Sequence, residues 1–170
     1  APVHAVPGDR FVIRNAQATA TIGGGVVLDP FGPARKRRSA TRSAWLQALH
    51  DYIANDDIGA LLARSPLGLR SSTLVRLSQL PAQQINTPEG TLKVSLQGDD
   101  TLLIASTEAQ LLQTRILAAL TEFHARAPDD AGPELWRLKR IVAPDMEDRL
   151  WSRLVETLLA SGEIQQRGRS

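Results

Sequence analysis

Three consecutive glycines precede a group of basic residues, and together they could bind a phosphate group. The glycines occupy positions 23–25, and the basic group begins at Arg35. A phosphate-binding loop needs its glycines to open a helix, and the P-loop motif places a lysine directly after the last glycine. Here Gly25 is followed by a short β-branched run ending at Pro30, and Lys36 comes only after a second proline. We therefore interpret the glycines as a bulge or a close backbone approach inside a sheet.

The basic group itself could contact RNA. Clustered cations are sufficient for a salt-sensitive contact with phosphates, whatever loop carries them. The same residues would also suit a solvated linker that leads into the start of a helix, and the sequence leaves both interpretations open. The candidate RNA-binding residues of this basic segment are Arg35, Lys36, Arg37, Arg38 and Arg42.

A second pair of cations lies near the C-terminal end. Arg149 and Arg153 are one turn apart on the polar side of a predicted helix. In helix-turn-helix proteins the corresponding helix enters a nucleic-acid groove, so both residues are also candidates for RNA binding. In a repeat that serves only as a spacer, they would be the solvated side of an amphipathic helix.

Other residue types that could do chemistry do not form a recognisable site. The three histidines are far apart and no cysteine is present, so a metal site is not expected. No serine, histidine and acid set suggests nucleophilic catalysis. We predict no catalytic, cofactor-binding or metal-binding residue and no enzymatic activity for this chain. The tryptophans lie on apolar stripes and are predicted to be core residues rather than base-stacking platforms; they are Trp45, Trp136 and Trp151.

Composition and charge limit the function classes. The 170 residues are 42% hydrophobic and 22% charged, as in a soluble globular protein. No apolar stretch approaches the roughly 20 residues of a membrane span and no signal pattern is visible, so a cytoplasmic location is expected. Residues 1–42 contain seven basic and two acidic residues, whereas the remaining residues contain thirteen and sixteen. This imbalance favours a local polyanion contact over coating of nucleic acid along the whole chain.

The apolar period predicts strands first and helices afterwards. Residues 10–28 alternate like strands until "DPFGP" stops them, and helical periods follow from Ser39 to about Pro81. The helical part divides into a helix of about 14 residues, a short helix near Ile58, and a third helix that Ser71 or Ser72 can cap. The runs "TLKVSL" and "TLLIAS" then flank a "QGDD" turn. Three helices followed by a two-stranded ribbon describe a winged helix.

The same pattern begins again at an offset of 71 residues, which matches "LQAL" to "LAAL". The second copy has a helix over about 107–126, a breaker "APDDAGP", a short helix near Leu135, and a third helix that Gly162 can cap. We expect "EIQQRG" to begin a strand. No returning strand follows, so we interpret the chain as a fragment that ends inside or just after the second wing.

A family resemblance adds to this interpretation. The stretch "GDRFVIRNAQATATIGGGVVLDP" resembles the end of the last β-barrel domain of elongation-factor-Tu-like GTPases, and "FGPARKRR" resembles the basic linker to a winged-helix arm. Over essentially its whole length the chain resembles the bacterial selenocysteine-specific translation elongation factors, as a C-terminal fragment. The implied fold is mainly α with small β ribbons: terminal barrel strands and linker over 1–34, then tandem winged-helix domains over 35–106 and 107–170.

The resemblance also implies a function. The chain would be a spacer arm between a GTPase body that carries selenocysteinyl-tRNA and a module that grips an mRNA hairpin on the ribosome. GTP and magnesium would bind a GTPase domain absent from this chain, since no glycine-lysine-serine/threonine motif is present. The family's hairpin-binding residues lie in later repeats, so none is carried over. A winged-helix DNA-binding regulator is the alternative, although it has no need of the glycine-rich strand pair; a protein-interaction adaptor also stays open.

Overall fold

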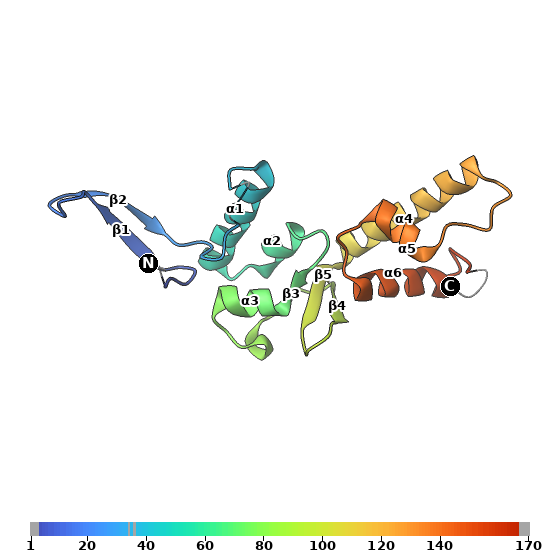
Figure 1. Cartoon of the computed structure of the whole chain (residues 1–170). Helices are drawn as coiled ribbons and strands as arrows, with labels where there is room; N and C mark the ends of the chain where they lie inside the picture. Colours follow the sequence, from blue (N-terminus) through green and yellow to red (C-terminus); the bar gives the residue numbers. More distant parts are fainter. Residues whose placement is uncertain (1–3, 34, 36, 167–170) are drawn as a thin grey trace. The chain divides into compact units, whose positions relative to one another are not determined.

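The chain folds into two compact units in a computed structural model that describes residues 4–33, 35 and 37–166 (Figure 1). The first unit contains the chain up to Arg64 together with Ser71–Pro88. The second contains Ser65–Arg70 and the chain from Glu89 onward. Among the helices in the described part of the chain, none has the length and apolar character to cross a membrane.

The first unit begins with a hairpin of two antiparallel strands, β1 (Arg10–Arg14) and β2 (Thr21–Val26). The Asn15 side chain closes its turn by accepting hydrogen bonds from the backbone N–H groups of Thr19 and Ala20, at 2.8 and 3.1 Å. Every residue of both strands is exposed. The hairpin therefore has the alternating sequence of a sheet without a layer packed on either face.

The three glycines lie inside β2, which confirms the interpretation of a close backbone approach. Gly24 pairs with Val12, and Gly25 pairs with Phe11. A Cβ atom on Gly24 would come within 2.7 Å of the Phe11 carbonyl oxygen, and one on Gly25 within 2.9 Å of the Phe11 ring. Gly23 has open space around it. The glycines let the Phe11 ring lie across the neighbouring strand, and they do not open a helix.

Three helices follow the hairpin in the first unit: α1 (Ala40–Asn55), α2 (Ile58–Ala63) and α3 (Ser71–Ser78), with a short 3₁₀ turn, η1 (Ala82–Gln84), behind them. Their existence and order confirm the helical periods in the sequence. Asp56 ends α1 in the left-handed conformation, and its N–H donates to the Tyr52 carbonyl oxygen at 2.7 Å. The buried side chains of these helices are Ala48, Leu49, Tyr52, Ile58, Leu61, Leu62, Leu74 and Leu77.

The second unit contains a three-stranded antiparallel sheet in the order β3-β5-β4, built from β3 (Leu69–Arg70), β4 (Thr91–Ser95) and β5 (Thr101–Ala105). The predicted "QGDD" hairpin is confirmed. Gly98 and Asp99 at its tip both have positive φ, and the Leu96 N–H donates to the Asp100 carbonyl oxygen at 2.8 Å. β3 was not predicted, because two residues are too few to show an alternating period.

Helices α4 (Ser106–Arg126), α5 (Leu135–Val142) and α6 (Asp148–Ala160) complete the second unit. β5 leads directly into α4, and the Ser106 N–H donates to the Gly90 carbonyl oxygen at 2.8 Å. Side chains of the ribbon and of the three helices share one core. Its most deeply buried members are Ile104, Leu112, Ile116, Leu150 and Leu154.

The helices repeat along the chain with one insertion. The ends of α1 and α4 are 71 residues apart, as the sequence offset predicts. The starts of α2 and α5 are 77 residues apart, and so are those of α3 and α6. Six residues are therefore inserted between the first and second helices of the second copy, where the "APDDAGP" breaker lies. The domain limits at residues 34 and 106 stay a prediction.

Two expectations about the second copy are wrong. Trp136 is 62% exposed, so it is not a core residue, whereas Trp151 is buried as predicted. The predicted strand at "EIQQRG" does not form over residues 163–166, the part of it that the structure describes. Instead, the N–H groups of Glu163 and Ile164 donate to the Leu158 carbonyl oxygen and close the end of α6. A strand needs a partner strand, and these residues have none within the described part of the chain.

Candidate nucleic-acid interface

Arg42 connects the segment after the hairpin to α1. Its guanidinium lies 2.8 Å from the Asp29 carboxylate, and the two side chains are only 14% and 10% exposed. A Cβ atom on Gly32 would lie 2.8 Å from the same guanidinium, so the linker backbone passes directly over it. Arg42 therefore has a packed ion-pair partner, which Arg35, Arg37 and Arg38 lack among the described residues. Its main effect here is to hold the linker against the helix.

A second arginine holds the same linker. The Arg76 guanidinium of α3 lies over the Phe31 ring, 5.0 Å from its centroid, in a cation–π arrangement. The Phe31 N–H donates to the Asp29 carboxylate at 2.9 Å and so shapes the turn. The "DPFGP" stretch is therefore fastened to α1 and α3 rather than loosely tethered.

The other described cations of the basic segment are exposed at the surface. Arg35, Arg37 and Arg38 are exposed. Arg37 donates from Nε to the Pro33 carbonyl oxygen at 3.2 Å. Within the described residues, Arg35 and Arg38 have no ion-pair or hydrogen-bond partner. Lys36 lies outside the described residues.

The electrostatics of α1 add to the positive potential of this segment. Ser39 caps the helix, and its hydroxyl accepts from the Arg42 N–H at 3.1 Å. The first turn of α1 contains no acidic residue. A helix N-terminus carries a partial positive charge, so it repels cations placed beside it and attracts anions. Arg35, Arg37 and Arg38 therefore add positive charge next to this end of α1, and no acidic side chain of its first turn offsets them.

Arg149 and Arg153 lie on the exposed side of α6, as the apolar stripe predicts. The opposite side of the helix packs into the core through Leu150 and Leu154. Glu156 is exposed one turn beyond Arg153 and reduces the net charge of this face to +1. Neither arginine has an ion-pair partner among the residues that the structure describes.

The acidic residues at the start of α6 are paired elsewhere. Asp148 forms an ion pair with Lys139 of α5. Glu147 pairs with Arg70 of β3, whose guanidinium also lies 3.8 Å from the Asp100 carboxylate. These pairs connect α6 to α5 and to the sheet, and they leave the neighbouring Arg149 uncompensated.

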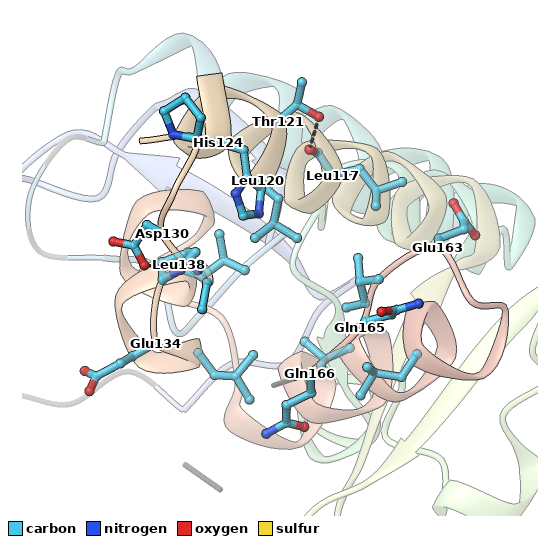
Figure 2. A pocket seen from close by; sticks show the side chains of 18 residues that line it. Leu117, Leu120, Thr121, His124, Asp130, Glu134, Leu138, Glu163, Gln165 and Gln166 are labelled. Carbon is cyan, nitrogen blue, oxygen red and sulfur yellow. Dashed lines mark hydrogen bonds between the residues drawn. The ribbon is translucent and has the colours of Figure 1, made fainter. Parts of the chain in front are cut away.

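The second unit also contains a cavity of about 670 Å³ between α4, α5 and the segment after α6 (Figure 2). Its wall includes Leu117, Leu120 and Leu138, and its edge carries the carboxylates of Asp130 and Glu163. Among the described residues that line it, none is lysine or arginine. The acidic edge makes this cavity unsuitable for a phosphate, so it is separate from the candidate RNA-binding residues.

In the described ranges, no group of three histidine or acidic side chains could hold a metal ion. Burial raises the pKa of the Tyr52 hydroxyl above its ordinary value of 10.0; a hydrogen bond with Ser78 lowers it and the charge of Asp56 raises it further. Tyr52 is packed in the core of the first unit, and this burial favours the neutral hydroxyl over the charged phenolate.

Comparison with known proteins finds the same family at both ends of the chain. Residues 1–34 match the family described as "Selenocysteine-specific elongation factor, beta-barrel domain", and residues 117–170 match "Elongation factor SelB, winged helix". The selenocysteine-specific elongation factor of Escherichia coli (strain K12) is 30% identical to the chain over 171 residues. That alignment covers 96% of this chain and 26% of the E. coli protein, so the chain spans about a quarter of its relative's length.

Proposed function

From the membership of this chain in the selenocysteine-specific elongation factor family, we propose that it works in selenocysteine incorporation as an arm of such a factor. The arm would link the body that carries selenocysteinyl-tRNA and hydrolyses GTP to the module that binds the mRNA hairpin on the ribosome. The observation that carries this proposal is the order of the two matches: barrel strands come first and a winged helix last, within one continuous alignment to the E. coli factor.

The packing of the second unit supports the role of a spacer. The ribbon side chains Val94, Leu102 and Ile104 lie in the same core as the helix side chains Leu112 and Leu154. A continuous core of this kind resists bending, because any displacement would open apolar surface to water. The strand-to-helix step at Ser106 therefore lies within a compact body.

GTP and magnesium would act in another part of the factor. The glycines at 23–25 lie in a strand, so they do not fit a loop that wraps phosphates. The chain also lacks a glycine-lysine-serine/threonine motif. The residues of this chain would consequently position RNA and the neighbouring domains, and they would take no part in the chemistry of GTP hydrolysis.

We further propose that the basic segment contacts phosphates of tRNA or ribosomal RNA. Arg35, Arg37 and Arg38 are exposed beside the positive end of α1, while Arg42 holds the linker through Asp29. Lys36 belongs to the same run of cations in the sequence. Arg149 and Arg153 offer a second, weaker contact, since Glu156 shares their face.

The test is a titration of the chain against labelled selenocysteine tRNA, the mRNA hairpin and a random DNA duplex, at about 50 and 200 mM salt. We expect salt-sensitive tRNA binding. The double variant Arg35→Ala/Arg38→Ala should weaken it and lower the salt slope by about 1.5, because two phosphate contacts are lost. The matched control Arg64→Ala/Arg115→Ala removes two exposed cations elsewhere and should leave tRNA binding unchanged.

Equal losses in both double variants would contradict a local contact and indicate general charge attraction. Binding to the DNA duplex in preference to both RNAs would contradict the translation role and favour a DNA-binding regulator. If none of the three ligands binds, the proposal of RNA contact by the basic segment fails, and the arm would act through its shape alone.

A further inference from the structure

One face of α5 exposes apolar and cationic side chains together. Trp136 is 62% exposed and Ile141 is 61% exposed, although both are large apolar residues. Arg137 and Arg140 are exposed beside them. Because an α-helix turns by about 100° per residue, these four side chains cover one continuous arc of about 140°. The arc is a single surface of indole, sec-butyl and guanidinium groups, which we call the α5 face.

Core packing does not explain this surface. The opposite side of α5 enters the core through Leu138, which is 2% exposed, and it is flanked by the half-buried Leu135 and Val142. The helix therefore has its apolar anchor without Trp136. An exposed tryptophan next to an exposed isoleucine suggests a surface that another molecule covers.

The indole ring is oriented by a neighbouring side chain. The Trp136 Nε1–H donates to the Glu134 carboxylate. This bond uses the edge of the ring, so it limits rotation of the indole without covering its π-face. A ring held in this way loses less side-chain freedom when a ligand stacks on it.

The charges of α5 itself favour a polyanion, and its two unpaired arginines outweigh the single Glu134 carboxylate at the edge of the ring. α5 carries three cations and no acidic residue. Lys139 is already paired with Asp148, whereas Arg137 and Arg140 have no ion-pair partner in the described part of the chain. Lysine and arginine near a helix C-terminus also suit the helix dipole, which accounts for Lys139 and Arg140 but not for Arg137. Two free guanidiniums beside an indole are the combination that single-stranded nucleic acids bind, by base stacking and phosphate contact.

We propose that the α5 face binds single-stranded nucleic acid, with one unstacked base on Trp136 and the flanking phosphates on Arg137 and Arg140. Side chains four residues apart on a helix lie about 5–6 Å from each other, so Arg140 is one turn from the ring. The ligand is RNA, a choice that rests on the proposed function; the site itself rests on the geometry of α5. It is separate from the basic segment and lies in the other compact unit.

The experiment measures binding of a labelled ten-residue oligouridine and the matching oligothymidine, with tryptophan fluorescence as a second readout. We expect both to bind and to quench the fluorescence of the exposed indole. Trp136→Leu should weaken binding about tenfold or more and abolish most of the quenching, because one stacking contact is lost. Arg137→Ala/Arg140→Ala should lower the salt slope by about 1.4.

Matched controls separate this site from general effects. Leu111→Ala alters another exposed apolar residue, on α4, and Arg64→Ala/Arg115→Ala removes two exposed cations. Neither should change oligouridine binding. Because Trp136 is exposed, Trp136→Leu should leave the melting temperature unchanged. If Trp136→Leu misfolds, Arg137→Ala/Arg140→Ala still tests the same site.

Oligouridine binding that is unaffected by Trp136→Leu and by the arginine variant would overturn the proposal and leave the α5 face as a surface for a protein. Preference for oligouridine over oligothymidine would indicate that the site also recognises the 2′-hydroxyl. Equal affinity would indicate binding by stacking and charge alone. Both results support the site. Loss of tRNA binding in Arg35→Ala/Arg38→Ala together with unchanged oligouridine binding in Trp136→Leu would reject this site while the proposed function stands.

Discussion

The described part of the chain contains two small antiparallel sheets whose surroundings differ completely. The β1–β2 hairpin is exposed along every residue of both strands. The β3-β5-β4 sheet buries Leu102, Leu103 and Ile104 of its central strand. Similar strand sequences thus form a sheet with a core in one unit and a sheet without one in the other. Strand pairing follows the local pattern, but stability depends on whether a second layer covers the sheet.

The largest predicted effect compares two isoleucines in these sheets. Ile104 in β5 is fully buried, and Ile13 in β1 is 48% exposed. Ile104→Ala should lower the free energy of unfolding by about 2–5 kcal/mol, because it removes buried methyl groups and leaves a cavity. Ile13→Ala should change it by less than about 0.5 kcal/mol. Urea unfolding followed by circular dichroism measures both, and equal losses would show that the hairpin is also packed.

A second comparison uses two glycines. Gly68 precedes β3 with φ +89°, and a Cβ atom there would lie 2.8 Å from the Leu102 side chain. Gly68→Ala should cost about 1–3 kcal/mol through backbone strain and crowding. Gly23 in β2 has open space and no positive φ, so Gly23→Ala should be nearly neutral. Thermal melting distinguishes them, and a destabilised Gly23 variant would contradict the exposed hairpin.

A third prediction concerns how the hairpin is attached to the helices. A double-mutant cycle of Arg42→Ala and Asp29→Ala should give a coupling energy of about 1–2 kcal/mol, because both side chains are largely shielded from water. The exposed pair Arg126 and Glu122 on α4 is the control and should give about 0.3–0.5 kcal/mol. A coupling no larger than the control's would mean that the linker is not held by this ion pair.

The smallest effect is a decrease of the free energy of unfolding at alkaline pH, caused by Tyr52 of α1. The pKa of Tyr52 is raised in the folded state, so its contribution to stability is full below pH 10.0 and is lost as the pH rises through the folded value. Relative to the natural chain, Tyr52→Phe should therefore gain stability as the pH is raised above 10.0. Tyr52 is the single tyrosine of the chain, so tyrosinate absorbance reports it directly. Ionisation of the Tyr52 hydroxyl with the ordinary tyrosine pKa of 10.0 would contradict its burial.

Periodic segments were predicted well because their pattern is local. The helical stretches before Pro81 and after Ser106 confirmed the apolar period, and the turn at Gly98 followed from its residues. Failures came where an element depends on a distant partner. The two-residue β3 exists because it pairs with β5, and "EIQQRG" does not form a strand over 163–166 because no strand lies beside it in the described part of the chain.

The candidate site divides in the same way. The sequence located the cations of the basic segment. It could not show that Arg42 forms a shielded ion pair with Asp29 while Arg35 and Arg38 are exposed. Trp136 was assigned to the core because it was read as part of an apolar stripe, although apolar residues occur on more than one side of the short α5 helix. Spacing alone does not say which of those sides meets the core.

By itself, the sequence determined the order of the elements, the charge imbalance and the family. These properties follow from residues near each other in the chain and from motifs such as the glycine-rich strand before "FGPARKRR". The tertiary structure alone decided which side chains are available. Burial and ion pairing are set by contacts between residues such as Arg42 and Asp29, or Leu138 and the core around it. A side chain is free to bind a ligand only when no such contact uses it first, and that depends on the whole fold.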